Sequence, residues 1–128
     1  MTIAEVSEKY DLTQDTLRYY ERIRLIPRVN RNKNGIRDYT EEDCRWVEFI
    51  KCMRNAGLPI EALIEYVALF QQGDTTIGAR KELLTDQRKQ LIQKMEDMQK
   101  TLERLNYKIK VYEGTVVKKE NKLKRAED

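Results

Sequence analysis

The sequence predicts a mainly α-helical fold, with an N-terminal head of short helices and one β-hairpin, followed by a long helix. Three observations predict it: apolar residues at helical spacing, an Asn-Gly pair at residues 34–35, and apolar heptads from residue 84 to residue 112. We expect a head over residues 1–70, a polar linker over 71–75 and a long helix over 76–113. A charged tail over 114–128 is expected to be flexible.

Residues 2–24 predict two short helices joined by a tight turn, which is the helix-turn-helix arrangement. Thr2 begins the first helix with a capping box, and Thr13 caps a second helix that we expect to reach residue 24. The polar face of the second helix carries Gln14, Arg18 and Tyr19. Such donors suit a helix that enters the major groove of DNA, although an ordinary solvated face is the alternative.

The segment 28–39 predicts a small basic β-hairpin. Pro27 is expected to end the preceding helix, and Asn34-Gly35 favours a type I′ turn, which needs positive φ at both residues. A solvated loop is the alternative. A hairpin packed beside a helix-turn-helix gives a winged helix-turn-helix.

Two further helices are expected to supply most of the core. Thr40 begins the first of them, which ends near Ala56 with Gly57 after it, and Pro59 is expected at the first helical position of the next. Their apolar residues are Trp46, Val47, Phe49, Ile50, Met53, Ile60, Leu63, Ile64, Val67 and Phe70.

The long helix carries an apolar coiled-coil seam. At 1.5 Å per residue its length is about 55 Å, which leaves it little local core. We therefore expect a partner helix, most simply from a second copy of the chain, although the heptads leave open whether the two run parallel or antiparallel. Arg88 departs from the pattern. The predicted dimer interface consists of Leu84, Leu91, Met95, Met98, Leu102, Leu105 and Ile109.

Positive charge is concentrated in one part of the chain. Residues 18–37 hold seven basic residues and one acidic residue, Glu21, while the other 18 basic and 21 acidic residues nearly balance. A local basic patch on a nearly neutral protein indicates a polyanionic partner such as nucleic acid.

The composition argues against several other classes of protein. No apolar run is long enough to span a membrane and no signal peptide is evident, so we expect a cytoplasmic protein. Two cysteines without histidine make a poor metal site, and we expect no metal and no cofactor. Without paired catalytic groups or a glycine-rich phosphate loop, the sequence does not predict an enzyme.

Several motifs resemble the MerR family of bacterial transcription regulators. They are the run 16–26 around Leu17-Arg18-Tyr19-Tyr20-Glu21, the segments 28–30, 35–39 and 42–43, and the region 56–60, together covering residues 1–70. The resemblance implies a homodimer held by an antiparallel coiled coil. It also implies an operator in double-stranded promoter DNA, which the dimer bends so that RNA polymerase can engage.

The resemblance also implies which residues contact DNA. Gln14, Arg18 and Tyr19 are expected at the major groove and its backbone. The expected wing contacts to phosphates are Arg31, Lys33, Arg37 and Tyr39.

The neighbourhood of Cys52 resembles the thiol-based branch of the family that responds to aldehydes and other electrophiles. Lys51 or Arg54 is positioned in sequence to favour the thiolate, and a small electrophile would then be the inducer in a stress response. An inert, buried cysteine is the alternative reading for Cys52, and the favoured one for Cys44. For the whole chain, the alternative is a coiled-coil interaction module whose basic patch binds polyanions without sequence preference.

Overall fold

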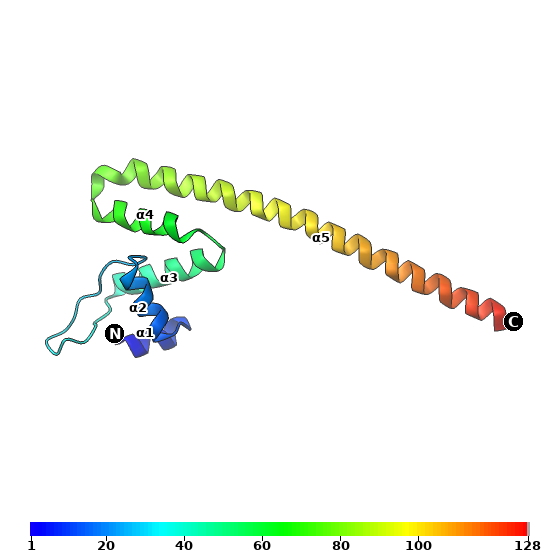
Figure 1. Cartoon of the computed structure of the whole chain (residues 1–128), viewed down its shortest axis with the longest axis horizontal. Coiled ribbons are helices and arrows are strands. Elements are labelled where there is room, and N and C mark those ends of the chain that lie inside the picture. Colours follow the sequence, from blue (N-terminus) through cyan, green and yellow to red (C-terminus); the bar gives the residue numbers. More distant parts are fainter. Residues whose placement is uncertain (128) are drawn as a thin grey trace. The chain divides into compact units, whose positions relative to one another are not determined.

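The computed structural model describes residues 1–127, with side chains described to residue 115 and at Lys118. The chain divides into two compact units, Met1–Arg88 and Lys89–Asp128. The predicted mainly α-helical fold is confirmed (Figure 1). The elements in order are α1 (Ile3–Tyr10), α2 (Gln14–Arg22), α3 (Glu41–Asn55), α4 (Ile60–Gln71), the 3-10 turn η1 (Asp74–Thr76) and α5 (Ile77–Glu127).

The helix-turn-helix forms as local sequence signals predict. Thr2 and Glu5 make a reciprocal capping box at α1, and the Thr13 hydroxyl accepts from the Thr16 amide at the start of α2. The turn between the helices uses Asp11 in the left-handed conformation, with φ at 51°. An aspartate tolerates this region better than most residues, which explains a tight turn without glycine.

Helix α2 ends at Arg22, two residues before the expected end, and Pro27 does not end it. Arg24 adopts a left-handed φ of 65°, and the Leu25 amide donates to the Tyr20 carbonyl at 2.8 Å. This is a Schellman turn, a helix stop usually made with glycine. Because residue 24 is an arginine and not a glycine, the sequence does not predict this helix stop.

The hairpin turn differs from the predicted type I′ turn. Gly35 has a positive φ of 76° but Asn34 does not, and the Asn32 side chain instead accepts from the amides of Asn34 and Ile36. The pairing within it is one isolated antiparallel bridge, Arg31 to Arg37. Val29 and Tyr39 at its two ends are buried, so the hairpin is anchored at its base. We call residues 28–39 the wing.

Helices α3 and α4 meet at a sharp corner. Thr40 and Asp43 form a capping box at the start of α3. At its end Gly57 has a φ of 85°, and the Leu58 amide donates to the Met53 carbonyl at 3.0 Å, as expected for a glycine stop. Pro59 is the N-cap of α4, one residue earlier than predicted.

The core lies in the N-terminal unit, where α1 to α4 and the base of the wing meet. Of the residues expected there, Phe49 and Met53 are half-buried and Phe70 is 36% exposed. Phe70 instead joins a partly exposed group of aromatic rings, in contact with Trp46 at 5.0 Å between centroids. The buried apolar residues are Val6, Leu17, Tyr20, Leu25, Ile26, Val29, Tyr39, Cys44, Trp46, Val47, Ile50, Leu58, Leu63 and Val67.

A hydrogen-bonded turn links α4 to α5. The buried Thr76 hydroxyl donates to carbonyls of Leu69 and Gly73, and Arg80 donates to the Thr76 hydroxyl at 3.1 Å. The Arg80 guanidinium also lies 5.4 Å from the centre of the Phe70 ring. The predicted linker is therefore an ordered turn.

Helix α5 continues through Gly114 to Glu127, so the expected helix end near residue 113 is wrong. One glycine inside a helix costs only about 1 kcal/mol, which neighbouring turns can offset. The expected flexibility of residues 114–128 stays a prediction, and Asp128 lies outside the described residues. Within the described part of the chain, none of the helices is long and apolar enough to cross a membrane.

Candidate DNA-binding interface

The two faces of α2 are clearly separated by burial. Leu17 is fully buried and Tyr20 is 7% exposed, which fixes the helix against the core. Arg18 is exposed, Tyr19 is 38% exposed and Gln14 is half-buried on the remaining surface. The structure therefore presents the three predicted α2 residues as a polar face of the N-terminal unit.

Side chains on this face contact one another through exposed interactions. Arg18 donates to Asp15 at 3.1 Å and to Gln14 at 3.3 Å, and Arg22 lies over the Tyr19 ring. The Asp15 side chain is 95% exposed and that of Arg18 is 45% exposed. Exposed pairs contribute little to stability, so Arg18 can exchange these partners for a phosphate or a base edge.

The wing presents its basic side chains unequally. Lys33 at the tip is exposed, and Arg31 is exposed but donates to the Gly35 carbonyl at 2.8 Å. Arg37 is partly buried and forms an ion pair with Glu21 of α2 at 2.8 Å. Arg31 and Lys33 are thus open to solvent, whereas Arg37 is held at the junction of wing and α2.

Tyr39 does not lie where the predicted phosphate contact requires it. It is 2% exposed, and its buried hydroxyl is the one such side-chain atom without a hydrogen-bond partner among the described residues. Burial raises the pKa of the Tyr39 phenol, and the nearby Glu21 carboxylate raises it further. The wing needs an anchor at its base, and Tyr39 provides it.

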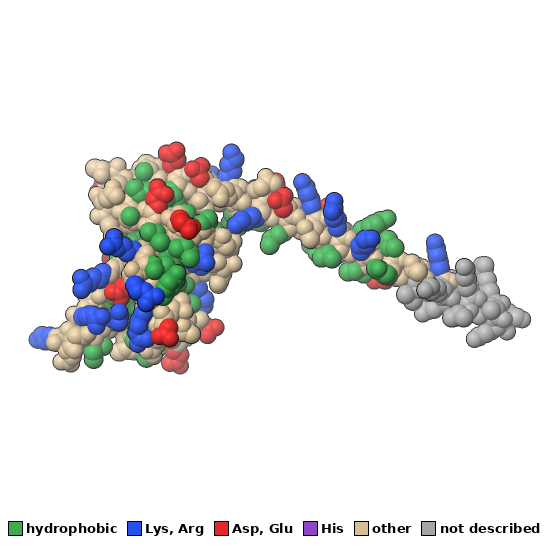
Figure 2. All heavy atoms as spheres, viewed as in Figure 1, with side chains coloured by type: hydrophobic (Ala, Val, Ile, Leu, Met, Phe, Trp, Pro, Cys, Tyr) green, Lys and Arg blue, Asp and Glu red, His purple; other side chains and the backbone are tan. Residues whose placement is uncertain are grey.

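A basic hollow of about 640 Å³ lies between α2 and the wing. Figure 2 shows Lys and Arg side chains gathered on the wing side of the N-terminal unit. Three arginines that line the hollow were not among the predicted site residues, although the basic run of the sequence contains them: Arg22, Arg24 and Arg28. The lining residues are Arg18, Glu21, Arg22, Arg24, Ile26, Arg28, Arg37 and Gln71.

Cys52 and Cys44 differ in accessibility. Cys52 is exposed near the end of α3, whereas Cys44 is buried with its Sγ 3.9 Å from the Met1 sulfur. Lys51 donates to the Tyr10 carbonyl, and Arg54 donates to the Leu58 carbonyl at 2.7 Å. Both cations thus serve backbone carbonyls, and neither is shown in contact with the Cys52 thiol. The alternative of a buried Cys52 is wrong.

The predicted seam residues of α5 are largely uncovered in the single chain. Met95 is 61% exposed and Met98 is 72% exposed, while Leu91 is half-buried. Hydrophobic side chains are visible along this helix in Figure 2. The other uncovered positions of the heptad pattern are Leu84, Leu102, Leu105, Ile109 and Tyr112, while Ile77, Ile92, Tyr107 and Val111 are exposed outside it.

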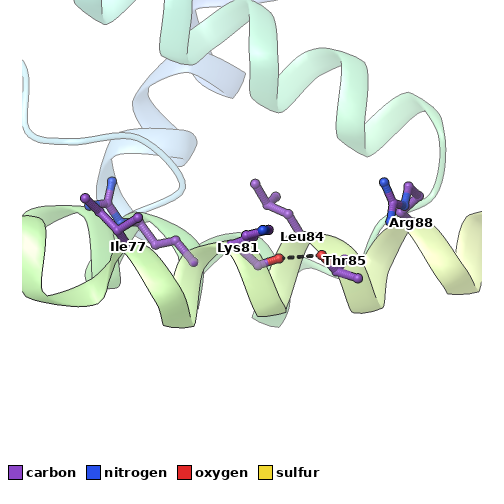
Figure 3. Close-up of a pocket in the computed structure, with 6 residues that line it drawn as sticks. Ile77, Lys81, Leu84, Thr85 and Arg88 are labelled. Atoms are coloured by element: carbon purple, nitrogen blue, oxygen red, sulfur yellow. Dashed lines mark hydrogen bonds between the residues drawn. The ribbon is translucent and has the colours of Figure 1, made fainter.

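The first turns of α5 form a shallow hollow around Leu84 (Figure 3). Ile77 lies at one end and Arg88 at the other, and the Thr85 hydroxyl donates to the Lys81 carbonyl. Arg88 occupies the position, four residues after Leu84, where the heptad pattern predicts the next apolar seam residue. The apolar seam resumes at Leu91.

Two family models match the chain. One, MerR HTH family regulatory protein, matches residues 1–69, and the other, MerR, DNA binding, matches residues 44–107. The chain is 62% identical to the HTH-type transcriptional regulator AdhR of Bacillus subtilis over 73% of this chain and 66% of that relative, just under two thirds of its length. It is 30% identical to an HTH-type transcriptional regulator of Haemophilus influenzae over 88% and 83% of the two chains.

Solved structures agree with the family models. A MerR family transcriptional regulator from Listeria monocytogenes superposes with a TM-score of 0.92 at 48% identity, covering 97% of this chain and 94% of that one. HiNmlR, a MerR family regulator lacking the sensor domain and bound to promoter DNA, superposes with a TM-score of 0.80 at 29% identity over 88% and 89%. This chain therefore belongs to the MerR family and is a DNA-binding transcriptional regulator, not an enzyme.

Proposed function

We propose that two copies of the chain bind a palindromic operator in a promoter spacer and distort it to control transcription by RNA polymerase in the cytoplasm. The observation that carries this proposal is the juxtaposition of the exposed α2 face with the basic hollow beside the wing. The α2 face offers Gln14 and Arg18, which suit base edges, and the hollow offers arginines, which suit phosphates.

The homodimer in this proposal is supported by the uncovered seam of α5. Exposed apolar side chains at heptad spacing need a partner helix, and identical chains pair most simply about a two-fold axis. In an antiparallel pair the a-like residues of one helix face the d-like residues of the other, so Met98 of one chain would lie beside Met95 or Leu102 of its copy. Two α2 helices placed about one turn of DNA apart, roughly 34–36 Å, would then read the two half-sites.

Distortion of the operator is proposed as the switch. Bending a site of this size by 40–90° costs of order 1–6 kcal/mol, so a dimer that favours the bent form changes how well polymerase fits the promoter. The test is transcription in vitro from a promoter with an overlong spacer that contains the palindrome. We expect added protein to change transcription there, and to have no such effect on a matched promoter with a spacer of standard length. Equal effects on both would contradict the mechanism.

A small electrophile is proposed as the inducer, with Cys52 as the sensor. The support is the exposure of Cys52 and its place on α3, which packs in the head. A thiolate that adds to an aldehyde or an activated alkene gains bulk at that position, which can bias a two-state arrangement of the head.

The matched control for Cys52 is the buried Cys44. We expect Cys52→Ser to abolish induction by an aldehyde in a reporter assay, and Cys44→Ser to leave induction intact. Full induction in the Cys52→Ser variant would eliminate the sensor role while leaving the DNA-binding function untouched.

A further inference from the structure

The ion pair between Glu21 and Arg37 connects α2 to the wing. Arg37 Nε donates to Glu21 Oε1 at 2.8 Å, across a sequence separation of 16 residues. The Glu21 side chain is 14% exposed and that of Arg37 is 22% exposed, far less than those of the Asp15–Arg18 pair on the same helix. Glu21 therefore holds Arg37 in a protected, charge-assisted contact, which is the stronger kind of hydrogen bond.

Glu21 conflicts with its surroundings if only charge is considered. It is the one acidic residue between Arg18 and Arg37, and it lines the basic hollow beside both of them. A carboxylate at a surface that binds phosphates repels them, so removing it would be expected to strengthen DNA binding. The geometry of the pair points to the opposite result.

The contact leaves the outer part of the Arg37 guanidinium available. Glu21 engages Nε, and the two terminal nitrogens make no hydrogen bond with any described residue. A guanidinium offers donors along two edges, and such a planar fork matches the oxygens of a phosphate. An arginine fixed in this way needs to lose less side-chain freedom when a phosphate arrives.

Arg37 is also the residue through which the wing is paired. Its backbone forms the isolated bridge with Arg31, and its side chain reaches α2. The base of the wing is anchored separately by Val29 and Tyr39. Glu21 thus acts where the side chain of the bridging residue of the wing reaches α2.

We propose that Glu21 is a positioning residue for DNA binding, which orients Arg37 so that its terminal nitrogens bind a backbone phosphate beside the α2 face. The proposal rests on the proposed operator binding. Glu21 does not contact DNA itself. Its carboxylate acts through Arg37, and the benefit of the oriented fork exceeds the repulsion between carboxylate and phosphate.

The test compares operator binding by Arg37→Ala, Glu21→Ala, Glu21→Gln and the double alanine variant over a range of salt concentrations. We expect Arg37→Ala to weaken binding about a hundredfold and to reduce the salt slope by about two, because the dimer loses one phosphate contact in each of its two chains. Glu21→Ala should do the same although it removes a negative charge. Glu21→Gln keeps an oxygen that accepts from Nε, and should retain binding within about threefold. The double variant should be no weaker than Arg37→Ala.

Glu48→Gln is the matched control, because it neutralises an exposed carboxylate on α3, outside α2 and the wing, and it should leave affinity and salt slope unchanged. Thermal unfolding of each variant identifies any loss of fold. The salt slope of operator binding then distinguishes the two roles of Glu21, because loss of a purely structural ion pair would lower the midpoint of thermal unfolding and leave the salt slope unchanged. Tighter binding by Glu21→Ala, or additive losses in the double variant, would overturn the proposal. If the wild type does not prefer the palindrome to a shuffled duplex, the proposed operator binding itself fails; if it does, a negative result with Glu21 removes only this inference.

Discussion

The two units of this regulator obtain their stability in different ways. The unit Met1–Arg88 contains a core in which residues such as Leu17, Val47 and Val67 are fully buried. The unit from residue 89 onward belongs to α5, and its described apolar side chains are exposed in the single chain except for the half-buried Leu91. The head therefore has a core of its own, whereas the helix can bury its seam only against a partner, which we propose is a second copy of the chain.

The largest effect is expected from the core of the head. Leu17→Ala removes a fully buried side chain between α2 and the core, and should lower the free energy of unfolding by about 2–5 kcal/mol. Chemical denaturation followed by tryptophan fluorescence measures it, because Trp46 lies in the same core. A loss below about 1 kcal/mol would show that the head has no independent core of this kind.

The second largest effect is expected on dimer formation, from a substitution in the seam of α5. Leu102→Glu places a charge in the middle of the seam, and we expect the dimer dissociation constant to rise by about 100-fold or more, because buried unpaired charges are strongly unfavourable. Analytical ultracentrifugation measures it. Lys100→Glu, at an exposed position outside the seam, is the control. If both variants remain dimeric, α5 does not provide the interface.

Dimer orientation can be tested through the two-fold axis. In an antiparallel pair, Met98→Cys should cross-link with Met95→Cys or Leu102→Cys on a second chain under mild oxidation, in a background with both natural cysteines replaced by serine. Leu91→Cys alone should not cross-link, but it should cross-link with Leu102→Cys or Ile109→Cys on a second chain. Efficient cross-linking of Leu91→Cys with itself would instead indicate a parallel pair.

Within the head, Arg18 should affect DNA binding more than stability. Its pair with Asp15 is exposed, so Arg18→Ala is expected to leave the free energy of unfolding nearly unchanged. Binding to the operator should weaken by about 1–3 kcal/mol for each half-site, with lost discrimination at one base pair in each half-site if Arg18 reads a base. Fluorescence anisotropy on operator variants measures it, with exposed Arg45→Ala of α3 as control. If Arg18→Ala greatly lowers the free energy of unfolding but leaves operator affinity intact, Arg18 stabilises the fold and does not bind DNA.

The smallest effect concerns Tyr39. Tyr39→Phe removes a buried hydroxyl that has no partner, so stability should rise by up to about 1 kcal/mol while DNA affinity stays the same. Because burial raises the pKa of this phenol in the folded state, the wild type should lose stability as the pH rises above about 10, the value of an unperturbed tyrosine. The variant should lose less there. Weaker operator binding by Tyr39→Phe would instead support the contact between the Tyr39 hydroxyl and a phosphate that the sequence predicted.

The sequence predicted features that depend on neighbouring residues. The caps at Thr2, Thr13 and Thr40 and the stop at Gly57 were found correctly, since each needs only a short segment. The motif around Arg18 identified the family for the same reason. The succession of helices followed from apolar spacing, and the wing followed from the Asn34-Gly35 pair.

Features set by distant contacts were missed. The burial of Tyr39 and the pairing of Glu21 with Arg37 depend on how the wing packs against α2, which no local pattern encodes. Arg24 takes a conformation that usually marks a glycine, so its helix stop had no sequence signal. Gly114 predicted a helix end, but α5 continues through it, because one glycine costs a long helix little free energy.

The reading of a palindrome by two chains through α2 and the wing can be measured as binding. The 128-residue chain is titrated onto the operator palindrome, one half-site and a shuffled duplex, and the mass of each complex is measured by sedimentation. We expect two chains on the palindrome, at least a thousandfold preference for it over the shuffled duplex, and much weaker binding to a half-site. Equal affinity for all three duplexes, with a salt dependence that ignores sequence, would contradict the account and favour a non-specific polyanion-binding module.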